Sequence, residues 1–445
     1  MNNVTELWTI LQLIWSGCYR TDYSVCNVFR AVIPHPQDRI PITIGHWPYA
    51  VLPFIPFLFL AYLARRPDTH TLRLLLLPIT VASILGTAFR FVWVKFEFNV
   101  YDWGQGLLAE ALIAKAIGYA WRKDGMLKIG ETKPNISLPS VKENGHIAHS
   151  PPTSAFSMHN LFPRWFRDAV ELGFSMRGIG WHYGTGVYIP EESRPLDRKS
   201  FLRSTTVAIL KNYLLLDLLD TLIKHIPGVG SPHGGSIYFS NLPLPVRFFV
   251  GFIIHSLTGS CIIAAFEMAY DLATVFSVLL LDYPPSAWPP IIENPWKARS
   301  LHEFWAKRWH QTLRETFFVM GGHPGRLIAG DVGMILGTFI GSGLYHELAA
   351  YAVGRGFDYR VLLFFAMQGP FLIIERLWRK FTGRRVGGRF GQLWTAFSIL
   401  ALGQVMADSW HMRGLGGGVI VPISGSPMRR LVLPLLKSIM KQHWT

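Results

Sequence analysis

The stretch FIGSGLYHELAAYAVG, residues 339–354, places a histidine and a glutamate inside a run that otherwise has the composition of a membrane-spanning helix. Ionisable side chains are costly in lipid, and those that do occur in a span usually serve a function. On a helix, the neighbours of His346 on its own face are mainly small: Ser342, Gly343, Ala349 and Ala350. We therefore expect a groove beside the ring. The ring is then either a functional group or a neutral histidine hydrogen-bonded to the next helix. Glu347 points elsewhere, and we expect it to pair with a basic or hydroxyl group.

The composition excludes an ordinary soluble protein. Of the 445 residues, 50% are hydrophobic and only 16% are charged, whereas soluble proteins are charged at about a quarter of their positions. The sequence predicts an all-α, multi-pass transmembrane bundle of about eight to ten spans, with interfacial helices and a buried reaction chamber. The expected crossings are 47–64, 74–94, 104–121, 201–223, 246–270, 327–353, 361–378, 392–412 and 419–436. Within 327–353, Gly333, Gly337 and Gly341 form a small-residue ridge that favours close packing by a neighbouring helix.

The net charge of +15 follows membrane topology and does not indicate a nucleic-acid partner. Lys and Arg cluster between the predicted spans, whereas residues 225–243 carry none, which is typical of cytoplasmic and non-cytoplasmic loops respectively. The apolar stretch 271–281 is an additional candidate, either re-entrant or a tenth span.

The chain divides into three predicted regions: N-terminal spans at 1–121, a cytoplasmic loop region at 122–200, and a membrane core at 201–445. Residues 130–154 are rich in Pro, Ser, Asn and Gly, and we expect a flexible loop over 122–164. Cys18, Cys26 and Cys261 give no disulfide framework. Residues 6–18 lack the basic start and the cleavage site of a signal peptide.

A second stretch, NPWKARSLHEFWAKRWHQTLRETFF at 294–318, has the pattern of an amphipathic helix at the membrane interface. Ser300 and Glu303 form a capping-box pattern at its start. Trp305 and Trp309 lie four residues apart on one face. This interpretation leaves His310 unexplained.

SLHEFWAKRWHQ, followed by SGLYHEL, resembles the wax-synthase-like branch of the membrane-bound O-acyltransferases. It is most similar to fungal members that acetylate terpenoid and polyketide-derived metabolites. RGIGW at 177–181 and FFAMQGPFLIIE at 364–375 are also similar to that branch. The resemblance runs from about Asp168 to the C-terminus, while the N-terminal third matches only as hydrophobic spans. The superfamily usually carries Asn where this chain has His310.

The resemblance implies transfer of an acyl group, most readily acetyl from acetyl-CoA, to a hydroxyl of a hydrophobic secondary metabolite such as a terpenoid or meroterpenoid. It implies His346 as the general base and His310 as an oxyanion donor, with no metal. The expected coenzyme contacts are Trp309, Arg308, Lys307, Arg299, Arg376 and Lys297. The expected substrate-lining residues are Ser342, Gly343, Gln368 and Glu375, and the last two share a helix face. We expect an integral membrane protein of the endoplasmic reticulum, in contact with lipid and of undetermined oligomeric state.

Two other functions are compatible with the sequence. A wax or sterol ester synthase would use long-chain fatty acyl-CoA in the same site. A multi-pass transporter would use His346, Glu347, Asp217 and Asp220 as an ion path. We expect structural roles for the two aspartates, with Asp220 paired to Lys224.

Two further side chains each have two interpretations. His255 is either a histidine satisfied at a helix contact or a substrate contact. Arg177 lies in a glycine-rich loop, where it either orients the coenzyme or packs on Trp181.

Overall fold

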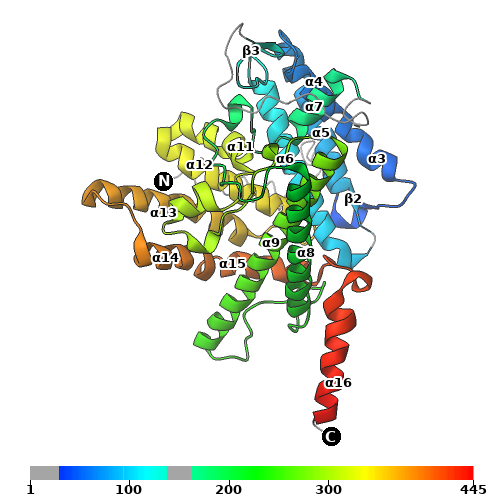
Figure 1. Ribbon diagram of the computed structural model, residues 1–445, viewed down its shortest axis with the longest axis vertical. Coiled ribbons are helices and arrows are strands. Elements are labelled where there is room, and N and C mark those ends of the chain that lie inside the picture. Colours follow the sequence, from blue (N-terminus) through cyan, green and yellow to red (C-terminus); the bar gives the residue numbers. More distant parts are fainter. Residues whose placement is uncertain (1–29, 94, 138–161, 444–445) are drawn as a thin grey trace.

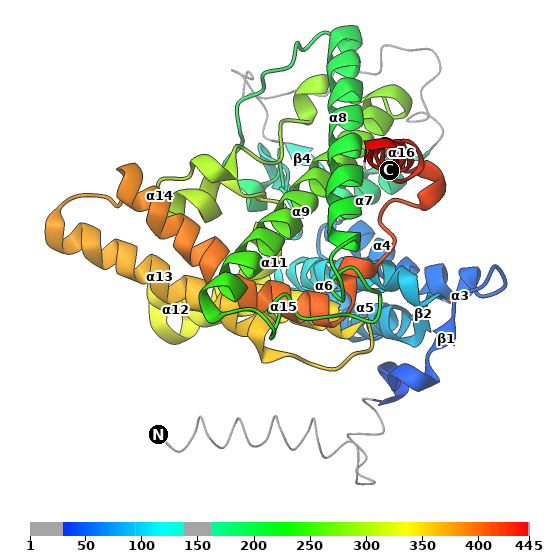
Figure 2. The same ribbon diagram turned by 90° about the horizontal axis from the view of Figure 1, so that it is seen from below.

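The computed structural model describes residues 30–93, 95–137 and 162–443, and the fold is predominantly helical (Figures 1 and 2). Cys18, Cys26, the segment 6–18 and most of the stretch 130–154 lie outside the described residues. The α-helices are α3 Trp47–Val51, α4 Ile55–Ala64, α5 His70–Arg90, α6 Asn99–Trp121, α7 Arg164–Phe174, α8 Arg198–Lys224, α9 Leu244–Leu280, α10 Leu301–Glu303, α11 Arg314–Phe317, α12 His323–Tyr351, α13 Tyr359–Thr382, α14 Gly388–Ala396, α15 Gln404–Met412 and α16 Leu433–His443.

Shorter elements connect these helices. Four are π-helical segments: η8 Phe304–Arg308, η9 Phe318–Gly322, η10 Phe397–Ala401 and η13 Met428–Val432. Among the described residues the strands form two small pairs: β1 Ile40–Pro41 with β2 Phe91–Val92, in parallel, and β3 Glu131–Lys133 with β4 Ile136–Ser137, antiparallel.

Six helical segments of the described chain are long and apolar enough to cross a membrane, which confirms the multi-pass fold. They are Trp47–Ala64, His70–Arg90, Leu244–Leu280, Arg314–Tyr351, Tyr359–Thr382 and Gly388–Met412. The expected crossings at 104–121 and 201–223 fall in α6 and α8, which are outside this set. Both helices bury charged residues, including Glu110 and Lys115 in α6 and Asp217 in α8.

Two expectations about the spans are wrong. The predicted crossing at 419–436 is not one helix, because the chain turns at Ile423–Gly425 and helical structure begins again only at Met428. Residues 271–281 form no separate segment either. They complete α9, which runs for 37 residues, or about 55 Å at 1.5 Å per residue. The helices α8 and α9 pack side by side (Figures 1 and 2).

The segment 314–351 folds back on itself as a helical hairpin. Ala329 and Gly330 leave the helical conformation, and Gly330 has a positive φ of 58°. Gly321 and Gly325 of the first leg then lie against Gly337 and Gly333 of the second. A Cβ built on Gly337 would lie 2.1 Å from the carbonyl oxygen of Gly321. The predicted small-residue ridge is therefore confirmed, and the helix that packs against it is the first leg of the same hairpin.

The N-terminal helices α4, α5, α6 and α7 share one hydrophobic core. Arg65 links it to the following region by ion pairs to Glu131 at 2.7 Å and Asp168 at 2.8 Å, and its guanidinium lies over the Trp181 ring. Met126 is buried in the same core. Residues 122–137, expected to belong to a flexible loop, are therefore packed against the helices.

The hairpin gives a test of the fold. Gly337→Ala should force the two legs apart, because the new methyl group meets backbone atoms that cannot rotate away, at a cost of about 1–3 kcal/mol. Gly86→Ala in α5 is the matched control, since no atom lies within 4 Å of its added Cβ. We expect a lower melting temperature and less monodisperse protein in detergent for Gly337→Ala only. Equal melting temperatures for both variants would contradict the hairpin contact.

Candidate active site

His346 lies on the second leg of the hairpin. Its Nδ1 is 2.7 Å from the carbonyl oxygen of Ser342, and a carbonyl oxygen can only accept a hydrogen bond. In the neutral ring Nδ1 therefore carries the hydrogen, and Nε2 keeps the lone pair that can take up a proton. The ring stacks on Phe365 of α13 with centroids 4.2 Å apart.

His310 lies between the π-helical segment η8 and α11. Its ring stacks on Phe266 of α9 with centroids 4.9 Å apart. Its Nδ1 is buried and has no hydrogen-bond partner. Burial lowers the pKa of His310 to about 3, and the nearby His346 lowers it further. His310 is therefore a neutral ring with one polar atom free to meet a ligand.

The hairpin explains why these two histidines approach each other. Gly325 faces Gly333 and Gly321 faces Gly337, so the residues before the first leg lie beside the end of the second. Direct ring contacts support this arrangement, because the Phe317 ring lies 5.4 Å from that of Tyr345 and 6.1 Å from that of His346. The residues that separate the SLHEFWAKRWHQ and SGLYHEL motifs in the sequence thus form the helical hairpin.

The expected interfacial helix over 294–318 is wrong. The chain forms α10 and η8, breaks at Trp309, and becomes helical again at Arg314. Gln311 stabilises the break by donating hydrogen bonds to the Trp305 and Trp309 carbonyls at 2.8 and 3.0 Å. Within η8, Trp305 donates from Nε1 to Gln368 of α13 at 3.3 Å. The aromatic face that suggested a lipid interface is therefore directed into the protein.

The predicted cap at the start of α10 is confirmed. Ser300 Oγ accepts a hydrogen bond from the Glu303 N–H at 2.9 Å. Glu375 accepts the N–H groups of Leu301 and His302 at 2.7 and 3.0 Å. Gln368 and Glu375 thus lie on one face of α13, as expected, and both contact the α10–η8 segment.

The expected groove beside His346 is filled by α13. A Cβ on Gly343 would lie 2.8 Å from the Leu362 carbonyl oxygen, and Phe365 covers one face of the imidazole. Ser342 is buried and directs its carbonyl to His346. The small residues therefore allow close helix packing, and the assignment of Ser342 and Gly343 to substrate contact stays a prediction.

The buried carboxylates that an ion path would use have partners within the protein. Glu347 forms an ion pair with Arg413 of α15 at 2.7 Å and accepts the Asp358 N–H at 2.6 Å, as its predicted structural role requires. Asp217 accepts hydrogen bonds from Ser426 and from the Met428 N–H.

Asp220 pairs with Lys224, as predicted, and with Arg429. Cations and hydrogen bonds therefore already hold Asp220, Glu347 and Asp217, the three acids that an ion path would use.

The basic residues predicted to meet the coenzyme fall into two groups. Lys297, Arg299, Lys307 and Arg376 are exposed. Burial lowers the pKa of His302, and the positive charges of Arg376, Lys307 and Arg385 lower it further, which locates these three cations around His302. Arg308 instead pairs with Glu303 at 2.7 Å and Glu293 at 3.4 Å.

Arg177 lies in the expected loop, where Gly178 and Gly180 have positive φ angles. Its guanidinium donates to the carbonyls of Pro289 and Pro290, both at 2.8 Å, and lies over the Tyr270 ring. The suggested packing on Trp181 is wrong. Arg177 fixes the chain before the α10 segment.

Two tryptophan rings near His346 are not predicted by any pattern in the sequence. The ring of Trp410 in α15 lies 6.5 Å from His346, and that of Trp103 in α6 lies 5.5 Å from Trp410. The Nε1 of each is buried without a hydrogen-bond partner. No motif marks either residue, because α6 and α15 are far apart in the chain and meet only in the folded protein.

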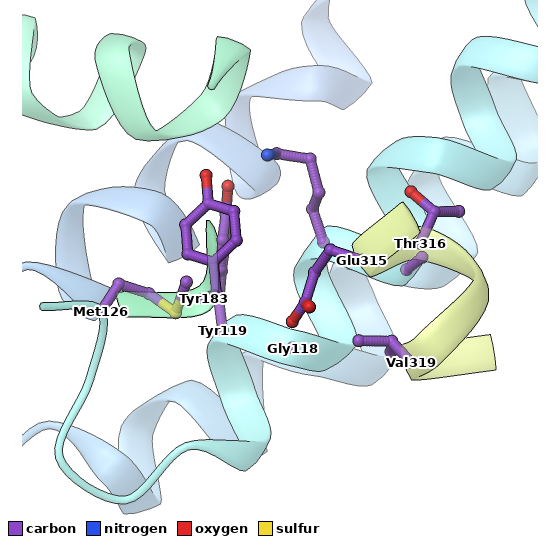
Figure 3. A pocket seen from close by; sticks show the side chains of 9 residues that line it. Gly118, Tyr119, Met126, Tyr183, Glu315, Thr316 and Val319 are labelled. Atoms are coloured by element: carbon purple, nitrogen blue, oxygen red, sulfur yellow. The ribbon is translucent and has the colours of Figure 1, made fainter. Parts of the chain in front are cut away.

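A separate small cavity borders α6 and α11 (Figure 3). Its lining includes Lys115, Tyr119, Tyr183 and Glu315, and its volume is about 20 Å³. That is room for a water molecule and not for a substrate. Lys115 donates to the Ser175 carbonyl at 2.9 Å. We assign this cavity no part in the site.

The neutral state of His310 predicts a pH dependence of stability. As the pH falls below the ordinary value of 6.5, the unfolded chain takes up a proton that the folded chain resists until about pH 3. Stability should therefore be lost as the pH falls through this window. His310→Asn cannot titrate, so its melting temperature in detergent should fall less steeply than that of the wild type. Parallel curves would contradict the buried neutral ring.

Residues 288–367, which include both histidines, match the model of the membrane bound O-acyl transferase family. The chain is similar to the O-Mevalon transferase yanI of Aspergillus niger, with 26% identity over 42% of this chain and 46% of that protein. It is 24% identical to the acetyltransferase sirH of Emericella nidulans over 77% of this chain and 79% of the relative. It is also 32% identical to the acyl-CoA–sterol O-acyltransferase 1 of Arabidopsis thaliana, over 19% and 27% respectively.

Proposed function

We propose that this chain, an acyltransferase that belongs to the membrane bound O-acyl transferase family, moves an acetyl group from acetyl-CoA to a hydroxyl of a hydrophobic secondary metabolite, such as a terpenoid or meroterpenoid. The observation that carries the proposal is the inward-facing His346, whose Nδ1 is committed to the Ser342 carbonyl. The similarity to acetyltransferases such as sirH supports the acetyl donor. We propose the endoplasmic reticulum membrane as its location.

In the proposed reaction, Nε2 of His346 removes the proton of the acceptor hydroxyl. The hydroxyl oxygen attacks the thioester carbon, and the carbonyl oxygen becomes an oxyanion that accepts a hydrogen bond from the neutral His310 ring. Collapse of this intermediate breaks the carbon–sulfur bond, and the CoA thiolate takes the proton from His346. The products are the ester and free CoA. General base catalysis of this kind contributes about 10² to 10⁴ in rate, and the reaction uses no metal.

The coenzyme would enter from the basic side of α10 and α13. Lys307, Arg376 and Arg299 are exposed there and can pair with phosphate oxygens. We include Trp309 and Arg308 as neighbours of this path, although Arg308 would have to leave its glutamates to bind phosphate. Gln368 and Glu375 would support the chamber indirectly, through Trp305 and the start of α10.

The second candidate is a sterol or wax ester synthase that uses long-chain acyl-CoA. The similarity to the plant sterol acyltransferase favours it. Purified protein supplied with labelled acetyl-CoA or palmitoyl-CoA and a panel of lipophilic alcohols separates the two candidates by the donor that is consumed.

Replacement of the base tests the function directly. His346→Ala should lower ester formation by about 10² or more, because the hydroxyl then has no proton acceptor. His225→Ala is the matched control, since His225 makes the same contact with a carbonyl four residues earlier, that of Thr221, at 2.7 Å. Turnover is measured per molecule of monodisperse protein. Near-normal turnover of His346→Ala would refute the assignment.

The role of His310 is tested by two substitutions. If the ring only donates a hydrogen bond, His310→Asn still presents an N–H group and should keep part of the activity that His310→Ala loses. Its turnover should be about tenfold or more above that of His310→Ala. An amide cannot shuttle protons, so equal inactivity of two well-folded variants would defeat the donor role. Nearly unchanged turnover per folded molecule in both variants would show that His310 is structural.

A further inference from the structure

A second group of unpartnered polar atoms lies where α9 meets α15, away from His310 and His346. His255 is 6% exposed and Gln404 is 5% exposed. The Nδ1 of His255 and the Oε1 of Gln404 are both buried without a hydrogen-bond partner. A buried polar atom without a partner costs about 1–3 kcal/mol, so two of them together call for an explanation.

Two glycines bring these side chains together. A Cβ on Gly403 would lie 2.4 Å from Cε1 of His255, and a Cβ on Gly251 would lie 2.6 Å from Oε1 of Gln404. Gly251 and His255 are one helical turn apart on α9, and Gly403 directly precedes Gln404 in α15. Both free atoms therefore lie at the contact between α9 and α15, which we call the polar position.

This polar position is joined to the candidate active site by an apolar path. Gly251, His255, Ile262 and Phe266 follow one face of α9, at steps of four, seven and four residues. Phe266 stacks on His310, and Ile262 packs against the cluster that contains Phe364 and Phe365. From His255 to Phe266 the helix rises about 16 Å. The distance suits a molecule whose reacting hydroxyl and a second polar group lie at opposite ends of a hydrophobic body.

The chemistry of the two atoms selects the ligand group. The amide oxygen of Gln404 only accepts hydrogen bonds. The His255 ring bonds the Leu400 backbone carbonyl, and because Nδ1 has no partner, this bond uses Nε2–H and leaves Nδ1 as an acceptor as well. A hydroxyl can donate its proton to one of these two acceptors, whereas a ketone can donate to neither.

On the premise of the proposed acyl transfer, we infer that His255 and Gln404 form a recognition site for a second hydroxyl at the far end of the acceptor. The preferred acceptors are thus elongated hydrophobic diols. The enzyme esterifies the hydroxyl beside His346 and leaves the one beside His255 free.

The test uses three steroid alcohols that share the reacting hydroxyl and differ at the far end of the ring system, which carries hydrogen, a hydroxyl or a ketone. The wild type should esterify the diol with a kcat/KM about tenfold or more above that of the mono-alcohol. The ketone should show no such gain. Thermal shifts of the purified protein with each alcohol give the same comparison for binding without turnover.

Variants assign the preference to the two residues. Gln404→Leu and His255→Leu should reduce the ratio of diol to mono-alcohol to about one, while mono-alcohol turnover persists. Ser260→Ala, on an exposed position of α9, is the control and should keep the wild-type ratio. An unchanged ratio in both leucine variants overturns the inference. Equal kcat/KM of the wild type for all three alcohols also overturns it, and would indicate that trapped water satisfies the two atoms. Absence of ester from every alcohol defeats the proposed function itself.

Discussion

The contact between glycine backbones across the hairpin determines the arrangement of the rest of the site. Because Gly321 and Gly325 have no side chains, the first leg can lie directly on Gly337 and Gly333 of the second. This contact fixes the register of the two legs, and the register brings the residues before the first leg alongside the end of the second. The break after η8 then turns the His310 ring into the interior, next to the aromatic cluster around His346. Close approach of small residues is an established way to join helices in lipid, where the hydrophobic effect does not drive association.

The charged and the neutral polar groups of this interior differ in whether they have partners. Three of the buried carboxylates are paired with arginines: Glu347 is bound by Arg413, and Asp217 and Asp220 by Arg429. A buried charge without a partner would be strongly destabilising. Several neutral groups, in contrast, have free atoms, among them His310, Trp410, Trp103, His255 and Gln404. The ion pairs link the helices, whereas the neutral groups keep unused hydrogen-bonding capacity in the interior.

Local patterns in the sequence predicted the features that depend on local physics. The glycine ridge, the Ser300 cap, the pairing of Asp220 with Lys224, and the shared face of Gln368 and Glu375 all follow from helical spacing. The interfacial helix was mispredicted because Trp305 and Trp309 have the same spacing whether their face meets lipid or protein. The positions of Trp410, Trp103 and Gln404 depend on contacts between distant helices, which no pattern in a single sequence reveals. The last expected span failed because hydropathy does not register that Pro422 and Gly425 interrupt the helix.

The first leg of the hairpin is short for a membrane protein. Residues 314–328 rise about 22 Å, while the hydrocarbon layer of a bilayer is about 30 Å thick. The tip nevertheless carries an exposed ion pair between Arg326 and Asp331, and charged groups of this kind belong in the headgroup layer. Lipid meets such a mismatch by thinning around the protein. In a bilayer the hydrocarbon layer would therefore be thinner beside the hairpin, which would shorten the distance between either leaflet and the two histidines at its base.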